Sequence, residues 1–152
     1  MQKVRFCESQ TVIFAKIGAV LCTEKKCILV SACLLGNSCK YDGEDNDNKD
    51  VKALCENYKI IPVCPECMGK LEIPREPSEI RDGRVYSRSG KDVTDNFVRG
   101  AQRALELARR FGCKIAVLKE KSPSCGFGMT ELFRIRLQTD TELRQSCFTI
   151  TE

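Results

Sequence analysis

Cys27-Ile28-Leu29-Val30-Ser31-Ala32 is a short and almost continuous apolar run that is rich in strand-forming residues. A run of this kind is typical of a central strand in a parallel sheet, because helices cover both faces of such a sheet. Two similar runs follow, Ile60-Ile61-Pro62-Val63 and Ile115-Ala116-Val117-Leu118. The sequence therefore predicts three buried strands.

Two segments with helical periodicity separate these strands. The apolar side chains of the first segment are Val51, Leu54, Cys55 and Tyr58. Those of the second segment, which spans residues 93–111, are Phe97, Ala101, Ala104, Leu105, Ala108 and Phe111. Asp47 or Asn48 can cap the first helix, and Asp92 or Thr94 can cap the second, which Gly112 ends.

The alternation of strands and helices predicts the fold class. Strand, helix, strand, helix, strand is the order of crossover connections in a parallel sheet. We therefore expect an α/β fold: one compact domain with a small, mostly parallel sheet flanked by helices, in a Rossmann-like three-layer arrangement. The segment 64–91 contains Pro65, Pro74 and Pro77, and we expect an ordered loop with turns there and no helix.

The composition excludes several classes of protein. The chain has 152 residues, 42% of them hydrophobic and 30% charged, with a net charge of +4, as expected of a globular domain and not of a disordered chain. It has no histidine, which excludes Ser-His and Cys-His catalytic pairs and every metal site that uses imidazole. Proton transfer must therefore use another side chain or a bound water.

Eleven cysteines are present, an odd number without regular spacing. This pattern does not favour a disulfide framework, and we expect a reducing compartment, the cytoplasm. Cys64-Pro65-Glu66-Cys67 is a single C-x-x-C, whereas a strong zinc signal needs two. Redox thiol exchange through Cys64 and Cys67 stays open as an alternative.

Residues 1–26 precede the first predicted strand. Their apolar stretch from Val12 to Cys22 is interrupted by Lys16 and is too short to span a bilayer. We interpret residues 1–26 as an N-terminal extension that is not exported, or as an added strand, and we expect no association with a membrane.

Three cysteines follow the ends of the three predicted strands: Cys33, Cys64 and Cys125. The carboxyl ends of parallel strands meet at one edge of a sheet, where ligands bind, so we expect these thiols to lie close together. Three thiolates without histidine suit an iron–sulfur cluster better than zinc. Each of these cysteines taken alone is more often a small buried apolar residue, which is the alternative interpretation.

Several ordered motifs follow one another along the chain: Ile28-Leu29-Val30-Ser31-Ala32-Cys33-Leu34-Leu35-Gly36, Cys39-Lys40-Tyr41-Asp42-Gly43, Pro62-Val63-Cys64-Pro65-Glu66, Pro74-Arg75 and Leu118-Lys119-Glu120-Lys121-Ser122-Pro123-Ser124-Cys125-Gly126. These motifs resemble those of the bacterial domain-of-unknown-function family that includes the thiouracil desulfidase TudS. The resemblance covers residues 27–128, a desulfidase-like α/β domain.

The resemblance implies a cofactor and an activity. In characterised relatives three cysteines hold a [4Fe–4S] cluster whose fourth iron accepts the sulfur of a thiocarbonyl, and the motifs put these ligands at Cys33, Cys64 and Cys125. The implied reaction is hydrolytic, non-redox removal of sulfur from thiouracil or from a thiolated tRNA base. The small positive charge favours a free base or nucleotide over whole tRNA, which is not excluded.

Other residues of these motifs have candidate roles. Glu66 is the candidate general base, or else an ordinary loop carboxylate. Ser122 and Ser124 are candidates for orienting substrate or for bonding to the cluster, or they only shape a turn. Arg75, Lys119 and Lys121 are candidates for balancing the cluster charge or binding a nucleotide phosphate, with solvated surface charges as the alternative.

Residues 129–152 are expected to form a divergent C-terminal tail. The glycine-rich stretch and closing strand of the resembled family are not recognisable after Gly128, and Thr130 to Leu137 alternates like an edge strand. Two alternatives to an enzyme therefore stay open: a non-catalytic metal- or cluster-binding protein, and a degenerate inactive member of the family.

Overall fold

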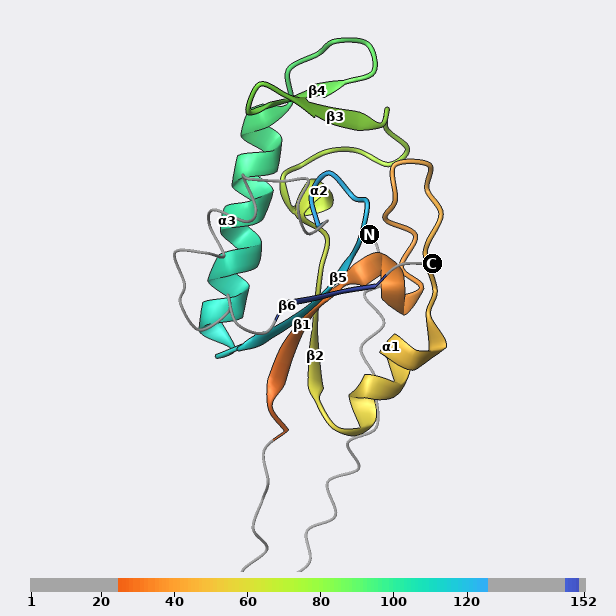
Figure 1. Ribbon diagram of the computed structural model, residues 1–152, viewed down its shortest axis with the longest axis vertical. Coiled ribbons are helices and arrows are strands. Elements are labelled where there is room, and N and C mark those ends of the chain that lie inside the picture. Colours follow the sequence, from red (N-terminus) through yellow and green to blue (C-terminus); the bar gives the residue numbers. More distant parts are fainter. Residues whose placement is uncertain (1–24, 126–146, 151–152) are drawn as a thin grey trace, which may run out of the picture.

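The structure is a computed structural model that describes residues 25–125 and 147–150. Its main sheet has four strands in the order β2-β1-β5-β6, and every pairing is parallel (Figure 1). The strands are β1 (Cys27–Ser31), β2 (Lys59–Val63), β5 (Ile115–Lys119) and β6 (Cys147–Ile150). The three predicted strands are confirmed, and β6 is a fourth strand that the sequence did not reveal.

The central strand β1 is buried because its side chains alternate between two apolar layers. Leu29 packs with residues of β2 and of the long helix α3 (Thr94–Arg110), while Ile28 and Val30 pack on the other face with Leu34 and Val51. All of these side chains are less than 3% exposed. Burial on both faces explains why β1 is a nearly continuous apolar run.

Helices cover both faces of the sheet, as predicted. One face is covered by α3 (Thr94–Arg110), whose bounds agree with the predicted helix to within one residue at each end. The other face packs against α1 (Lys49–Ala53) and the 3₁₀ helices η1 (Ala32–Leu35) and η2 (Leu54–Glu56). Asn48 caps α1, because its side-chain Oδ1 accepts hydrogen bonds from the backbone N–H groups of Asp50 and Val51. The α/β three-layer class is confirmed.

The prediction of a helix-free loop over residues 64–91 was wrong. This segment contains a short helix, α2 (Pro65–Met68), and an antiparallel pair, β3 (Ser78–Arg81) and β4 (Arg84–Ser87). Proline is tolerated in α2 because Pro65 occupies its first turn, where an N–H has no helical partner. Asp82 and Gly83 both adopt positive φ, which closes the tight turn between β3 and β4.

Helices α2 and α3 touch through their backbones. A methyl group placed on Gly100 would lie 1.8 Å from the carbonyl oxygen of Pro65, and one on Gly69 would lie 2.0 Å from the carbonyl oxygen of Asn96. The Asn96 side chain also donates to the Gly69 carbonyl at 2.9 Å. Glycine at these two positions therefore fixes α2, and the residues beside it, against the long helix.

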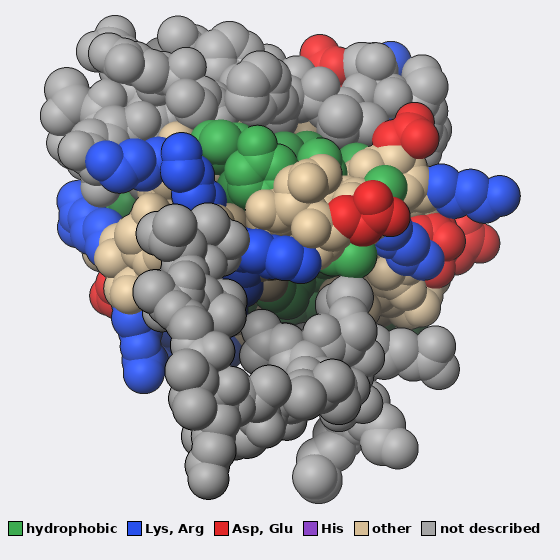
Figure 2. Space-filling model, turned by 90° about the horizontal axis from the view of Figure 1, so that it is seen from below, with side chains coloured by type: hydrophobic (Ala, Val, Ile, Leu, Met, Phe, Trp, Pro, Cys, Tyr) green, Lys and Arg blue, Asp and Glu red, His purple; other side chains and the backbone are tan. Residues whose placement is uncertain are grey.

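The amino end of the sheet is the end at which β1 and β2 begin. Figure 2 views the molecule from this end and shows lysine and arginine side chains around a strip of apolar side chains. Lys59 at the start of β2 lies 5.8 Å from the ring centroid of Phe111, which follows α3. Cys113 is buried at this end among the side chains that pack between α3 and the sheet.

Three expectations fall wholly or largely outside the described residues: the N-terminal extension, the edge strand over residues 130–137 and most of the C-terminal tail. Among the described residues, no helix has the length and apolar character needed to cross a membrane.

Candidate metal and catalytic site

The three predicted ligands follow three neighbouring strands. Cys33 lies in η1 directly after β1, and Cys64 lies between β2 and α2. Cys125 follows β5 through a short turn. Because β2, β1 and β5 are adjacent and parallel, the chain brings these cysteines to one edge of the sheet.

The three thiols influence one another electrostatically. The neighbouring Cys39 thiol lowers the pKa of Cys33 to about 7, against the effect of burial, while negative charge on Cys64 acts in the opposite direction. Burial raises the pKa of Cys125 to about 12, and charges on Cys64 and Cys33 add to this effect. The charge on Cys64 therefore acts on both of the other thiols.

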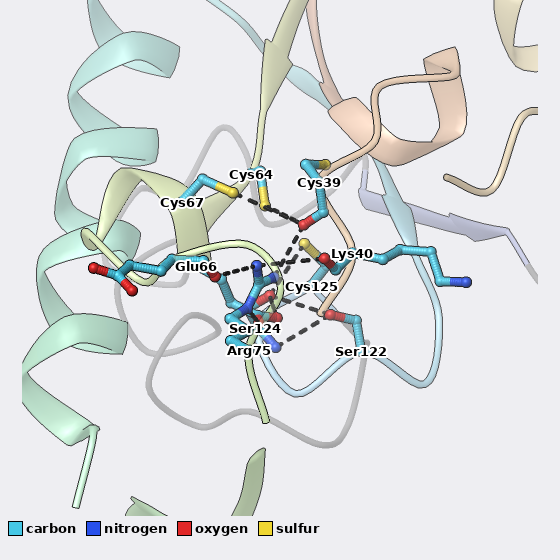
Figure 3. Close-up of polar contacts among 10 residues, drawn as sticks. Cys39, Lys40, Cys64, Glu66, Cys67, Arg75, Ser122, Ser124 and Cys125 are labelled. Carbon is cyan, nitrogen blue, oxygen red and sulfur yellow. Dashed lines mark hydrogen bonds and ion pairs between the residues drawn. The ribbon is translucent and has the colours of Figure 1, made fainter. Parts of the chain in front are cut away.

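Two further cysteines, Cys39 and Cys67, belong to this group, and the sequence predicted a ligand role for neither. Thiol hydrogen bonds from Cys39 and Cys67 hold the pKa of Cys64 well below its usual value. The Sγ atoms of Cys64 and Cys67 lie 3.7 and 3.8 Å from the carbonyl oxygen of Cys39 (Figure 3). The available signal for Cys39 was its place in the same loop as Cys33, and for Cys67 it was the C-x-x-C spacing.

Glu66 is buried at this edge of the sheet and is only 8% exposed. Its Oε2 accepts a hydrogen bond from Arg75 Nε at 2.7 Å, and its Oε1 accepts one from Ser124 Oγ at 2.8 Å. Burial acts against the charged guanidinium, but the Glu66 carboxylate leaves the pKa of Arg75 above its usual value. Glu66 is thus a buried carboxylate with a partner on each oxygen, and not a solvated loop residue.

The two predicted serines join this network. Ser124 is buried next to Cys125, and its Oγ lies 3.1 Å from Ser122 Oγ and 3.7 Å from Cys125 Sγ. A continuous chain of hydrogen bonds therefore runs from Ser122 through Ser124 to Glu66. Such a chain can orient a carboxylate and can pass a proton along its hydroxyl groups.

The predicted lysines differ from each other. Lys119 is half-buried at the end of β5, its backbone N–H donates to Ser31 Oγ at 3.0 Å, and its charge helps to lower the pKa of Cys33. Lys121 is exposed and adopts a positive φ of 57° in the turn before Cys125. Of these two lysines, Lys119 is the one whose charge acts on a thiol of this group.

The donor set has the chemistry that an iron–sulfur cluster needs. Over residues 25–125 and 147–150, no group of three or more His, Cys, Asp or Glu side chains is arranged to hold one metal ion. The cysteines are free thiols, and Arg75 and Lys119 supply positive charge beside them. Thiolates, hydroxyl and amide donors and nearby positive charge are what a cluster of negatively charged sulfides requires.

Comparison with known proteins agrees with this donor set. The model of the family described as 2-thiouracil desulfurase matches residues 28–149. The chain belongs to this desulfurase family. The matched range includes the three cysteines, Glu66, Arg75 and both serines, and it extends past Gly128 into β6. The family resemblance expected from the motifs is confirmed.

Two relatives illustrate the desulfurase family. The uncharacterized protein YbbK of Bacillus subtilis is 37% identical over 111 residues, which cover 66% of this chain and 74% of YbbK. The solved structure of the [4Fe–4S]-dependent thiouracil desulfidase TudS superimposes with a TM-score of 0.71 at 34% identity, covering 83% of this chain and 90% of TudS. Together, the family and the TudS structure support a role in desulfuration for this chain.

Proposed function

We propose that this protein hydrolyses the thiocarbonyl group of a thiolated pyrimidine such as 2-thiouracil, with a [4Fe–4S] cluster as its cofactor. The observation that carries the proposal is that Cys33, Cys64 and Cys125 follow three adjacent parallel strands at one edge of the sheet, where the buried Glu66 accepts a hydrogen bond from Ser124. The likeness to TudS, a [4Fe–4S]-dependent thiouracil desulfidase, supports it. The free thiols and the reducing conditions that they need support a cytoplasmic location.

Cys33, Cys64 and Cys125 would hold the cluster by their thiolates. When bound through three protein ligands, the cluster supplies an iron with an open position, a Lewis acid with affinity for sulfur. The lowered pKa of Cys33 and of Cys64 favours the thiolate form that ligation needs.

Glu66 is the proposed general base. It takes a proton from a water molecule, whose oxygen attacks the thiocarbonyl carbon; the carbon–oxygen bond forms, the carbon–sulfur bond breaks and sulfur leaves as hydrosulfide. The reaction converts C=S and water into C=O and hydrogen sulfide with no net oxidation or reduction. Ser124 orients the carboxylate through Oε1, and Ser122 extends the path along which the proton moves.

The substrate is proposed to be a small molecule. Arg75, one of the three cations suggested for a phosphate, is buried against Glu66, and Lys121 is the exposed one. A free base, or a nucleotide held by one exposed cation, agrees with this arrangement better than a polynucleotide, which binds through many phosphate contacts.

The test uses the full chain, purified without oxygen and reconstituted with ferrous iron and sulfide. We expect about four irons and four sulfides per chain, and uracil and sulfide in equal amounts from 2-thiouracil. Cys125→Ser should lose the bound iron and the activity, whereas Cys113→Ser, a substitution of an equally buried thiol at the other end of the sheet, should keep both.

A second pair of variants separates an enzyme from a protein that only binds a cluster. Glu66→Gln should keep the iron but lower kcat by about 100-fold or more, the usual contribution of a general base. Glu72→Gln, at an exposed carboxylate in the same segment, should leave kcat unchanged. A wild-type protein that carries the full cluster but forms no uracil, or a fully active Glu66→Gln variant, would contradict the proposed roles.

A further inference from the structure

Arg75 has more contacts in this site than its role as a candidate substrate ligand needs. We infer that Arg75 is a positioning residue: its guanidinium fixes the Glu66 carboxylate and the Cys39 backbone relative to each other, and so acts on the reaction through Glu66. This inference rests on the proposed function, and it assigns to Arg75 a role different from phosphate or substrate binding.

Most of the N–H donors of the Arg75 guanidinium already bond to protein atoms. A guanidinium has about five N–H donors. Nε donates to Glu66 Oε2, Nη2 donates to the Cys39 carbonyl at 3.0 Å, and Nη1 donates to the carbonyls of Lys40 and Glu72 at 3.5 and 3.3 Å. The side chain is only 8% exposed. Four of the five donors therefore point at protein atoms, and little is left for a substrate.

The acceptors of Arg75 include backbone carbonyls of the loop that follows β1 and contains Cys39. Three consecutive carbonyls bond to this one residue, because the backbone N–H of Arg75 donates to Tyr41 at 2.7 Å while the side chain reaches Cys39 and Lys40. The Cys39 carbonyl also lies within hydrogen-bonding distance of the thiols of Cys64 and Cys67. Arg75 thus ties the loop after β1 to the loop after β2 at the point where both carry thiols (Figure 3).

Arg75 is linked to the proposed reaction through the Glu66 carboxylate. Arg75 holds Oε2 of Glu66 while Ser124, from the loop after β5, holds Oε1. The carboxylate is consequently fixed in its plane and rotation by contacts from two different loops. A lysine keeps the charge but cannot reproduce the planar fork, so positioning by Arg75 should be lost in Arg75→Lys.

The experiment compares Arg75→Lys and Arg75→Gln with the wild-type protein, all reconstituted with iron and sulfide. If Arg75 positions Glu66, both variants should keep the iron and lose about 100-fold in kcat, the cost of misplacing a reacting group by roughly 1 Å, while KM for 2-thiouracil changes little. Arg103→Gln is the matched control, because Arg103 donates to the Met68 carbonyl of α2 from an exposed position. It should leave kcat and KM unchanged. A raised KM with unchanged kcat, or a fully active Arg75→Lys variant, would overturn the inference.

Two further measurements separate positioning from a general structural effect. Residues that act as a unit are not additive, so Glu66→Gln combined with Arg75→Gln should be no slower than Glu66→Gln alone. In addition, guanidinium ion in the buffer should restore part of the kcat of Arg75→Ala, whereas methylammonium should not. Additive losses would mean that Arg75 acts independently of Glu66, against the inference.

A measurement without turnover keeps this inference separate from the proposed function. The charge of Arg75 acts on Cys64, so its loss should lower the reduction potential of the cluster. We expect a lower potential in Arg75→Gln and an unchanged one in Arg75→Lys and Arg103→Gln. If the wild-type protein with a full cluster releases no sulfide from thiolated pyrimidines, the proposed function fails, whatever the role of Arg75. If the reduction potential is the same in all variants, the charge of Arg75 does not act on the cluster beside Cys64, and the inference about Arg75 fails.

Discussion

Both ends of the parallel sheet carry cysteines, but Cys33 and Cys64 at the carboxyl end have surroundings opposite to those of the buried thiols at the amino end. At the amino end, Cys27 begins β1 and packs against the core, and burial raises the pKa of Cys113 to about 11. At the carboxyl end, Cys33 and Cys64 have lowered pKa values because other thiols donate hydrogen bonds to them. The residue type is the same at both ends, and only the neighbours differ.

The difference follows from the direction of the chain. At the carboxyl end, loops that leave three adjacent strands bring polar donors together, whereas the amino end is built from the segments that enter the strands. Arg75, Ser124 and the Cys39 carbonyl all lie at the carboxyl end. The comparison teaches that the neighbours at the carboxyl end, and not cysteine content, separate Cys33 and Cys64, two of the proposed ligands, from the thiols of the core.

The largest effect is expected when each of two cysteines near the two ends of β1 is replaced separately by serine. Cys33→Ser should abolish iron binding and uracil formation, because serine does not replace a thiolate as a ligand for iron. Cys27→Ser, at a residue equally half-buried, should retain both. The measurement is iron and sulfide content together with uracil formation after anaerobic reconstitution. Loss of the cluster in Cys27→Ser but not in Cys33→Ser would reverse the comparison.

The next largest contrast concerns thiol reactivity in the cluster-free protein. With pKa values of about 7 for Cys33 and about 11 for Cys113, the thiolate fractions at pH 7 are about one half and about 10⁻⁴. The alkylation rate of Cys33 by iodoacetamide should therefore rise between pH 6 and pH 8 and then level off, while Cys113 stays almost unmodified. Peptide mapping by mass spectrometry measures both sites, and equal rates at neutral pH would break the comparison.

A smaller effect is expected from the contact that supports the carboxyl end. Gly100→Ala places a methyl group against the Pro65 carbonyl, so α2 must shift. We expect a loss of about 2 kcal/mol in the free energy of unfolding, because overpacking outweighs the better helix propensity of alanine. Gln102→Ala, at an exposed position of α3, is the control and should stay within about 0.5 kcal/mol. Denaturant unfolding of the two variants measures both values.

The sequence predicted the parts of the fold that have a clear period. The runs at β1, β2 and β5 and the seventeen-residue helix α3 were found because burial selects apolar residues at fixed spacing. Helix α2 was missed because four residues show no period, and prolines concealed the β3–β4 pair. The Asp82-Gly83 dipeptide was the signal that could have revealed that hairpin.

For the site, the sequence predicted which residues meet but not what they bond to. Strand ends grouped Cys33, Cys64 and Cys125, because topology alone brings those positions together. The bond from Ser124 to Glu66 joins residues 58 apart in the chain, and the Arg75–Cys39 bond joins residues 36 apart. Neither pairing has a spacing signal, since loop conformation decides it.

The parallel pairing of β2, β1 and β5 also decides when, during synthesis, all three proposed ligands become available. The third proposed ligand, Cys125, follows the last of these strands, so a nascent chain that ends before residue 125 offers only two of the three thiols. If these cysteines hold a cluster as proposed, the cluster can be completed only after β5 has been made and paired with β1.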